Sequence, residues 1–151
     1  MRMDLINVVR VDKSSELWNF LTEYAENCSW IAGKHLAELL RGENFTEWES
    51  VFAALADETI IGFCTFLKTD YYPENRYSPW ISSIFVDEAY RGNRISQKMI
   101  ETAIEYARSC QFKRVYIPSD MIGFYEKFGF SKIGELRNYD GDLDNIYYRD
   151  I

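Results

Sequence analysis

The most informative part of the sequence is the stretch Phe85-Val-Asp-Glu-Ala-Tyr-Arg-Gly-Asn-Arg-Ile-Ser-Gln-Lys-Met-Ile100, in which an apolar strand runs through a basic, glycine-bearing loop directly into an amphipathic helix. The first turn of a helix leaves backbone N–H groups without partners and carries the positive end of the helix dipole. Gly92 lets the backbone approach an anion closely, and Arg91 and Arg94 add positive charge. The stretch therefore predicts a phosphate-type anion site, although taken alone it also fits an ordinary surface turn.

A second motif follows about thirty residues downstream. The sequence Ser119-Asp-Met-Ile-Gly-Phe-Tyr-Glu-Lys-Phe-Gly-Phe130 comes after a short apolar run that ends at Pro118. Together, residues 91–96 and 124–130 resemble the acetyl-CoA-binding core of the GNAT superfamily of N-acetyltransferases. The resemblance is specific for residues 80–134 and weak before residue 45.

The loop departs from the family pattern at one position. The family loop is usually written Q/R-x-x-G-x-G/A, and here Arg91 matches its first position while Ser96 is a small residue at its last. Arg94 stands where the family usually has its middle glycine. An arginine at that position is able to reach a phosphate with its side chain.

The resemblance implies the fold and the cofactor. The expected fold class is α/β (α+β), with a mixed, mostly antiparallel sheet of six to seven strands, a parallel central pair splayed around the acyl-CoA, and about four flanking helices. Acetyl-CoA is the expected co-substrate. Its binding residues are expected to be Ile84, Phe85, Val86, Arg91, Gly92, Asn93, Arg94, Ile95, Ser96, Ser119 and Phe124.

Tyr125 is the candidate catalytic residue. Transfer of an acetyl group from a thioester to an amine needs a proton for the departing thiolate, and a phenol stays protonated at neutral pH. The tyrosine at this place in the family motif often has that role. The alternative is that Tyr125 only packs between Phe124 and Phe128. No general base is identified, because residues 80–86 contain no carboxylate; a water relayed by Ser82 or Ser83 is one alternative.

Apolar periodicity predicts the elements along the chain. A helix is expected from Ser14, where Leu17, Trp18 and Leu21 share one face. Residues 80–86 read as a central strand buried on both faces, and residues 114–117 as its parallel neighbour. Pro118 removes a hydrogen-bond donor there, which should let these two strands part. Further strands are expected at residues 5–11, 51–56, 59–68, 130–137 and 145–149, and further helices at 33–41, 95–110 and 121–128.

Bulk composition limits the class of protein. A chain of 151 residues is expected to form one domain over residues 1–151. Three widely spaced cysteines argue against a disulfide framework, and no long apolar run or signal segment is present, so we expect a cytoplasmic protein that does not bind membranes. The net charge of −7 disfavours nucleic acid and suits a cationic partner. The single histidine, His35, and the absence of a calcium-type loop lead us to expect no metal.

These observations predict an acetyl-CoA-dependent N-acetyltransferase that acts by direct attack on a primary amine of a small molecule. The open alternatives are a protein or peptide amine as acceptor, and a CoA-binding module without catalysis; a nucleotide-phosphate enzyme is least favoured, because no GxxxxGK[ST] pattern is present. The protein is expected as a monomer or homodimer. Aromatic residues outside the helical stripes are candidates for an acceptor cleft, although packing suits each of them singly: Trp30, Trp48, Tyr71, Tyr72, Tyr77, Trp80 and Tyr139.

Overall fold

The computed structural model describes residues 5–42, 45–74, 76–119 and 122–151. Its centre is a seven-stranded sheet in the order β1-β2-β3-β4-β5-β7-β6, in which β4 and β5 are the parallel pair. The strands are β1 (Ile6–Val11), β2 (Ser50–Ala56), β3 (Thr59–Leu67), β4 (Trp80–Val86), β5 (Arg114–Ser119), β6 (Ser131–Arg137) and β7 (Leu143–Asp150). The α-helices are α1 (Glu16–Asn27), α2 (Ile31–Gly42) and α3 (Ile95–Ser109).

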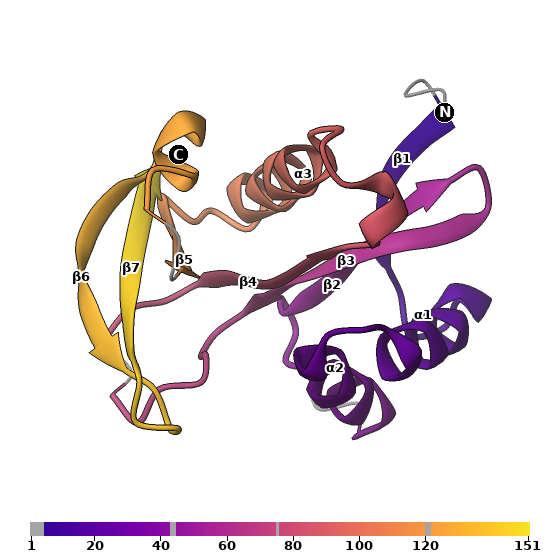
Figure 1. Cartoon of the computed structure of the whole chain (residues 1–151), viewed down its shortest axis with the longest axis horizontal. Helices are drawn as coiled ribbons and strands as arrows, with labels where there is room; N and C mark the ends of the chain where they lie inside the picture. Colours follow the sequence, from indigo (N-terminus) through magenta and orange to yellow (C-terminus); the bar gives the residue numbers. More distant parts are fainter. Residues whose placement is uncertain (1–4, 43–44, 75, 120–121) are drawn as a thin grey trace.

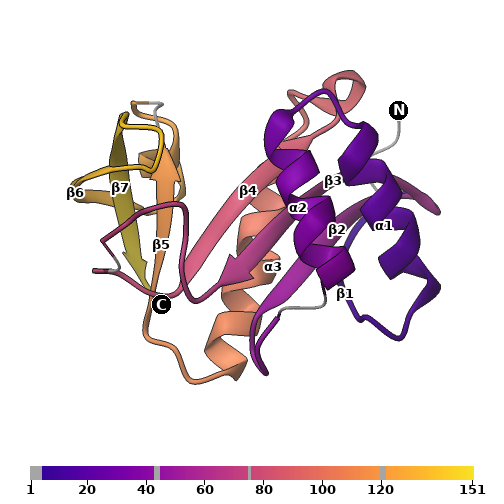
Figure 2. The same ribbon diagram turned by 90° about the horizontal axis from the view of Figure 1, so that it is seen from below.

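The helices cover both faces of the sheet. Figures 1 and 2 show α1 and α2 against one face of β1–β4 and α3 against the other. Each face has its own buried cluster, which contains Leu21, Leu36 and Phe63 under α1 and α2, and Ile81 and Met99 under α3. The expected mixed sheet is confirmed, as are strands near every predicted range.

Helix α1 begins where the sequence indicates. The side chain of Ser15 accepts a hydrogen bond from the Leu17 N–H and so caps the helix. The buried face carries Trp18 and Leu21. The Trp18 indole N–H donates to the Leu40 carbonyl at 3.1 Å, which ties α1 to the end of α2. This bond holds the two helices side by side.

Strands β4 and β5 separate after a single paired position, Trp80 with Tyr116. The Tyr116 N–H donates to the Pro79 carbonyl at 3.0 Å. Donors on one side of a strand recur every second residue, so the next donor toward β4 would come from residue 118. Pro118 has no N–H, while on its other side it pairs in register with Ile146 of β7. The splay predicted from Pro118 is therefore present.

Strand β4 contains a bulge at its middle. Phe63 pairs with Phe85 and Thr65 with Ser82, so two residues of β4 lie opposite Cys64. One of them, Ser83, has φ of 51°, a left-handed conformation unusual for a non-glycine residue. Ser83, Ile84 and Val86 are only half-buried. The expectation that β4 is buried on both faces holds for residues 80–82 and Phe85 and fails for the half-buried residues, since in the described part of the chain β4 pairs with β5 only at Trp80.

The described helices are three α-helices and two short 3-10 helices, η2 (Glu88–Tyr90) and η3 (Tyr125–Phe128), where about four helices were expected. The predicted helix at 121–128 is the single turn η3, and Met121 lies outside the described residues. Gly129 ends this turn with φ of 86°. No helix in the described ranges is long and apolar enough to cross a membrane.

Candidate functional site

A cavity of about 600 Å³ lies at the C-terminal end of β4. It is bounded by the open edge of β4, by the loop into α3 and by η3. The connection between α1 and α2 closes it from the other side of the sheet. Its lining residues are Ser29, Trp30, Ile84, Phe85, Val86, Tyr90, Arg91, Gly92, Arg94, Ile95, Ser96, Phe124 and Tyr125.

The loop before α3 holds its first arginine against the strand. The Arg91 Nε donates to the Val86 carbonyl at 2.9 Å, and its guanidinium carbon lies 5.7 Å from the centre of the Phe85 ring. The Asn93 amide donates to the Tyr90 carbonyl at 2.9 Å. Arg91 remains exposed, so it adds positive charge at the cavity mouth without being buried.

The N-terminus of α3 has the features of an anion site. The N-cap is Arg94, whose φ of 59° is left-handed and whose side chain makes no capping bond. Gly92 has φ of 84°, and a Cβ built there would meet nothing within 4 Å. The first-turn N–H groups of α3 therefore face an open space flanked by the exposed side chains of Arg91 and Arg94.

Tyr125 both lines the cavity and packs in the core. It is 6% exposed, and its ring lies edge-on to Phe124, with ring centres 4.9 Å apart. It also contacts Phe130 and Tyr147, with ring centres 6.2 and 6.3 Å away. Tyr125 therefore packs against aromatic side chains and also lines the cavity, as Ile84 and Phe85 do.

All of the predicted site residues except Asn93 and Ser119 line the cavity. Asn93 instead supports the loop through its bond to Tyr90, and Ser119 is buried at the end of β5. Ser29, Trp30 and Tyr90 also line it, and they were not predicted as site residues. Trp30 was only one of several aromatic candidates, because nothing in the sequence shows that the turn after α1 reaches β4.

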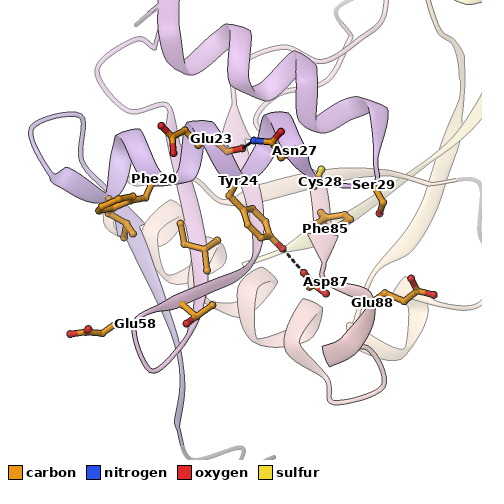
Figure 3. Close-up of a pocket in the computed structure, with 13 residues that line it drawn as sticks. Phe20, Glu23, Tyr24, Asn27, Cys28, Ser29, Glu58, Phe85, Asp87 and Glu88 are labelled. Atoms are coloured by element: carbon orange, nitrogen blue, oxygen red, sulfur yellow. Dashed lines mark hydrogen bonds between the residues drawn. The ribbon is translucent and has the colours of Figure 1, made fainter.

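A second hollow of about 610 Å³ adjoins the first, and Ser29 and Phe85 line both. Figure 3 shows it between α1, the β2–β3 turn and the residues after β4. Its rim is acidic, and the Tyr24 hydroxyl donates to Asp87 at 3.4 Å. Burial, with help from the Asp87 carboxylate, raises the pKa of Tyr24 well above its usual range. The carboxylates of its lining are Glu23, Glu58, Asp87 and Glu88.

The described residues contain no group of three or more His, Cys, Asp or Glu side chains placed to hold a metal ion. All three cysteines are free. Burial raises the pKa of the Cys64 thiol to about 12. A buried thiol of this kind is a poor nucleophile at neutral pH, and none of the cysteines lies in the first cavity.

The sequence of this chain is similar to that of known proteins. A profile of the acetyltransferase (GNAT) family matches residues 14–130. The chain is 31% identical over 85 residues to the spermine/spermidine N(1)-acetyltransferase of Bacillus subtilis (strain 168), covering 51% of this chain and 56% of that protein. This chain therefore matches little more than half the length of that relative.

Solved structures share the fold over nearly the whole chain. An aminoglycoside 6'-acetyltransferase type Ii has a TM-score of 0.73 at 18% identity, covering 95% of this chain and 96% of that one. A GNAT family acetyltransferase from Elizabethkingia anophelis, with acetyl-CoA bound, has a TM-score of 0.68 at 15% identity, covering 98% and 99%. Identities this low show a common fold and no more.

Proposed function

The chain belongs to the GNAT acetyltransferase family, and we propose that it transfers the acetyl group of acetyl-CoA to a primary amine of a small molecule by direct attack in a ternary complex. The cavity at the end of β4 carries this proposal. Around one space of about 600 Å³ lie the first turn of α3, the edge of β4 beyond its pairing with β5 in the described residues, and the Tyr125 side chain.

The residues present fit acetyl-CoA. The pyrophosphate would lie on the first-turn N–H groups of α3, with Arg91 and Arg94 beside it. The pantetheine arm would lie in the splay between β4 and β5 and use the backbone groups of β4 that no strand pairs. Ile84 and Val86 supply an apolar wall there. The acyl end would then lie toward the bulge at Ser83, in the cavity that Tyr125 lines.

The reaction needs few groups beyond these. The amine lone pair attacks the thioester carbon, and the carbonyl oxygen becomes an oxyanion. Backbone N–H groups freed from pairing at the β4 bulge are suited to stabilise that charge. The C–S bond then breaks, and the thiolate takes the proton of the Tyr125 phenol.

A small cationic amine is the acceptor class that we favour. The chain carries a net charge of −7, and such a charge attracts cations. The B. subtilis relative is named for acetylation of spermine and spermidine. A protein or peptide amine is the alternative acceptor, and a CoA-binding module without turnover is the alternative function. We infer that the protein is cytoplasmic, since three free cysteines suit a reducing compartment. We also propose one domain over residues 1–151 and a monomer or homodimer.

Isothermal titration with acetyl-CoA tests the proposal. We expect the wild type to bind, and Arg91→Ala and Arg94→Ala to weaken binding by about 5- to 20-fold each through loss of a charge-assisted phosphate contact. Arg108→Ala is the matched control, because Arg108 is exposed in the last turn of the same helix and pairs with Glu105. Absence of binding to the wild type would remove the cofactor assignment and the enzyme with it.

Turnover distinguishes the enzyme from a binding module. Release of CoA thiol is measured with spermidine, an aminoglycoside and an amine-bearing peptide as acceptors. Turnover with a small amine supports the proposal. Turnover with the peptide alone favours the alternative acceptor class, and binding without turnover of any of them favours the module.

A further inference from the structure

Two buried side-chain atoms lack a hydrogen-bond partner among the residues that the structure describes: Asp70 Oδ2 and Trp80 Nε1. Trp80 is the first residue of β4, and Asp70 belongs to the loop that leads from β3 to β4, with its carboxyl near Ser82 of that strand. Leaving a buried polar atom unpaired is costly, and a carboxylate oxygen more so than most. Such groups are concentrated at functional sites, so this end of β4 is a candidate for a role in the chemistry.

The Asp70 carboxylate is held by local contacts. Its Oδ1 accepts from the Tyr71 N–H at 2.7 Å, and the nearby Ser82 hydroxyl acts to lower the pKa of the carboxyl. Ser82 is buried and lies opposite Thr65, with the two hydroxyl oxygens 3.1 Å apart. Asp70 and Ser82 thus form a pair that joins the loop to the middle of β4.

Ser82 lies next to the reaction cavity. It is the last residue of β4 paired to β3 before the bulge at Ser83, and Ile84, two residues on, lines the cavity. Two residues of strand span about 7 Å. Among the described residues β4 pairs with β5 at Trp80 alone, and Ser82 itself is buried. Ser82 therefore lies two residues before the part of β4 that lines the cavity.

The surface beside this pair suits a cationic amine. Tyr71 and Tyr139 are exposed, with ring centres 5.1 Å apart, and the His35 ring lies 6.5 Å from Tyr71. Tyr71 also donates to Asp140 at 3.1 Å. Aromatic faces next to carboxylates attract cations.

We propose that Asp70 is the final proton acceptor of the transfer reaction and takes the proton of the acceptor amine through the Ser82 hydroxyl. This inference rests on the proposed acetyltransferase function. The ammonium gives one proton to Ser82 as Ser82 gives its own to Asp70, which leaves a neutral amine. After attack, the nitrogen loses a second proton, which restores the phenol that protonated the thiolate. One proton is thus left on Asp70 and returns to solvent.

The electrostatic surroundings support this role. Burial raises the pKa of Asp70 to about 6, and the Asp144 carboxylate adds to the rise, while the Tyr71 N–H and the Ser82 hydroxyl oppose it. The Tyr72 hydroxyl points elsewhere, since it donates to Asp144 at 2.9 Å. A carboxylate with a pKa near 6 is ionised at neutral pH and still basic enough to accept a proton.

The test is the pH dependence of kcat/KM for wild type, Asp70→Asn and Ser82→Ala, with acetyl-CoA and the amine that the wild type acetylates fastest. The wild type should lose activity below about pH 6. Each variant should lose about 100-fold in kcat/KM at neutral pH. Its pH profile should no longer show the acid limb, which is the fall in activity below about pH 6. The double variant should be no worse than either single one, because the two groups act as a unit. Asp142→Asn, an exposed change of the same charge, should keep the limb.

The possible outcomes separate the two claims. If the wild type neither binds acetyl-CoA nor turns over, the proposed function fails and this inference fails with it. If the wild type is active and Asp70→Asn keeps both its rate and its acid limb, only the role of Asp70 is overturned. Acetyl-CoA titration of each variant checks folding, and Ser82→Ala still tests the relay if Asp70→Asn does not fold.

Discussion

At the scale of single residues, the backbone conformation of Arg94 shows why the family loop usually has a glycine at this position. Its φ of 59° lies in the left-handed region, which glycine occupies without cost and other residues reach only with strain. The middle glycine of the family pattern suits this conformation. Here an arginine takes it instead, and its side chain stays exposed beside the N-terminus of α3. In the proposed function, this exposed guanidinium would lie beside the pyrophosphate of the cofactor.

Tyr125 gives the sharpest prediction at this scale. Tyr125→Phe removes only the hydroxyl and keeps the ring contacts with Phe124 and Tyr147. If the phenol protonates the thiolate, kcat should fall by about 100-fold, while the Kd for acetyl-CoA changes by less than about 3-fold. Steady-state kinetics and titration calorimetry measure the two quantities.

Phe128→Leu is the control for packing, since Phe128 contacts the Tyr125 ring at a centre distance of 6.4 Å but does not line the cavity. It should affect stability more than kcat. An unchanged kcat in Tyr125→Phe would leave Tyr125 with the packing role alone.

At the scale of elements, the shape of β4 is set by its neighbours on both sides. On one side, β3 approaches so closely that Gly62 has no room for a side chain: a Cβ there would lie 2.5 Å from the Phe85 carbonyl oxygen. On the other side, Pro118 of β5 offers no donor. Strand β4 therefore lies close to β3 and diverges from β5. The cavity lies on the side that faces β5.

Gly62→Ala should disturb this arrangement. The added methyl group would force β3 and β4 apart at Phe85, which lines the cavity, so we expect a loss of about 1–3 kcal/mol in the free energy of unfolding together with weaker acetyl-CoA binding. Urea unfolding and calorimetry measure the two effects. Gly134→Ala is the control in β6, where a Cβ would meet only the Tyr77 hydroxyl at 3.4 Å. If Gly62→Ala were as stable as Gly134→Ala, the contact would not constrain β4.

At the scale of the whole molecule, the buried carboxylate should make stability depend on pH. The pKa of Asp70 is raised from 3.8 to about 6 by burial, so the folded protein holds this proton more tightly than the unfolded chain. Between about pH 4 and pH 6 the folded state binds more protons, and stability from this group falls as the pH rises. Above pH 6 the full cost of the buried charge is present.

Asp70→Asn removes that cost. The free energy of unfolding of the variant, relative to the wild type, should rise by on the order of 2 kcal/mol between pH 4 and pH 7. Urea unfolding across this range measures the difference. Asp142→Asn, which is exposed, should show no such trend. A flat difference for Asp70→Asn would mean that the carboxylate is not held at a cost in the folded state.

The motifs and the ranges of the helices and strands could be predicted from the sequence. The apolar runs predicted the strand ranges, and the basic loop before Ile95 predicted an anion site that stays a prediction, because both depend on neighbours along the chain. The sequence could not place Ser29 and Trp30 on the cavity wall, since this depends on how α1 and α2 pack across the sheet. It also gave no reason to join Asp70 to Ser82, twelve residues on, because the loop between them has no periodic pattern.

The amino-acid sequence predicted the strand and helix ranges and a helix start suited to an anion after the central strand, because periodicity, glycine and proline act locally, and its family resemblance predicted the mixed sheet. The shapes of the sites came from the tertiary structure alone. The bulge at Ser83, the single pairing of Trp80 with Tyr116 and the Asp70 oxygen without a partner among the described residues arise where separate elements meet. Their geometry depends on the balance of pairing and burial over the whole sheet, which no local pattern records.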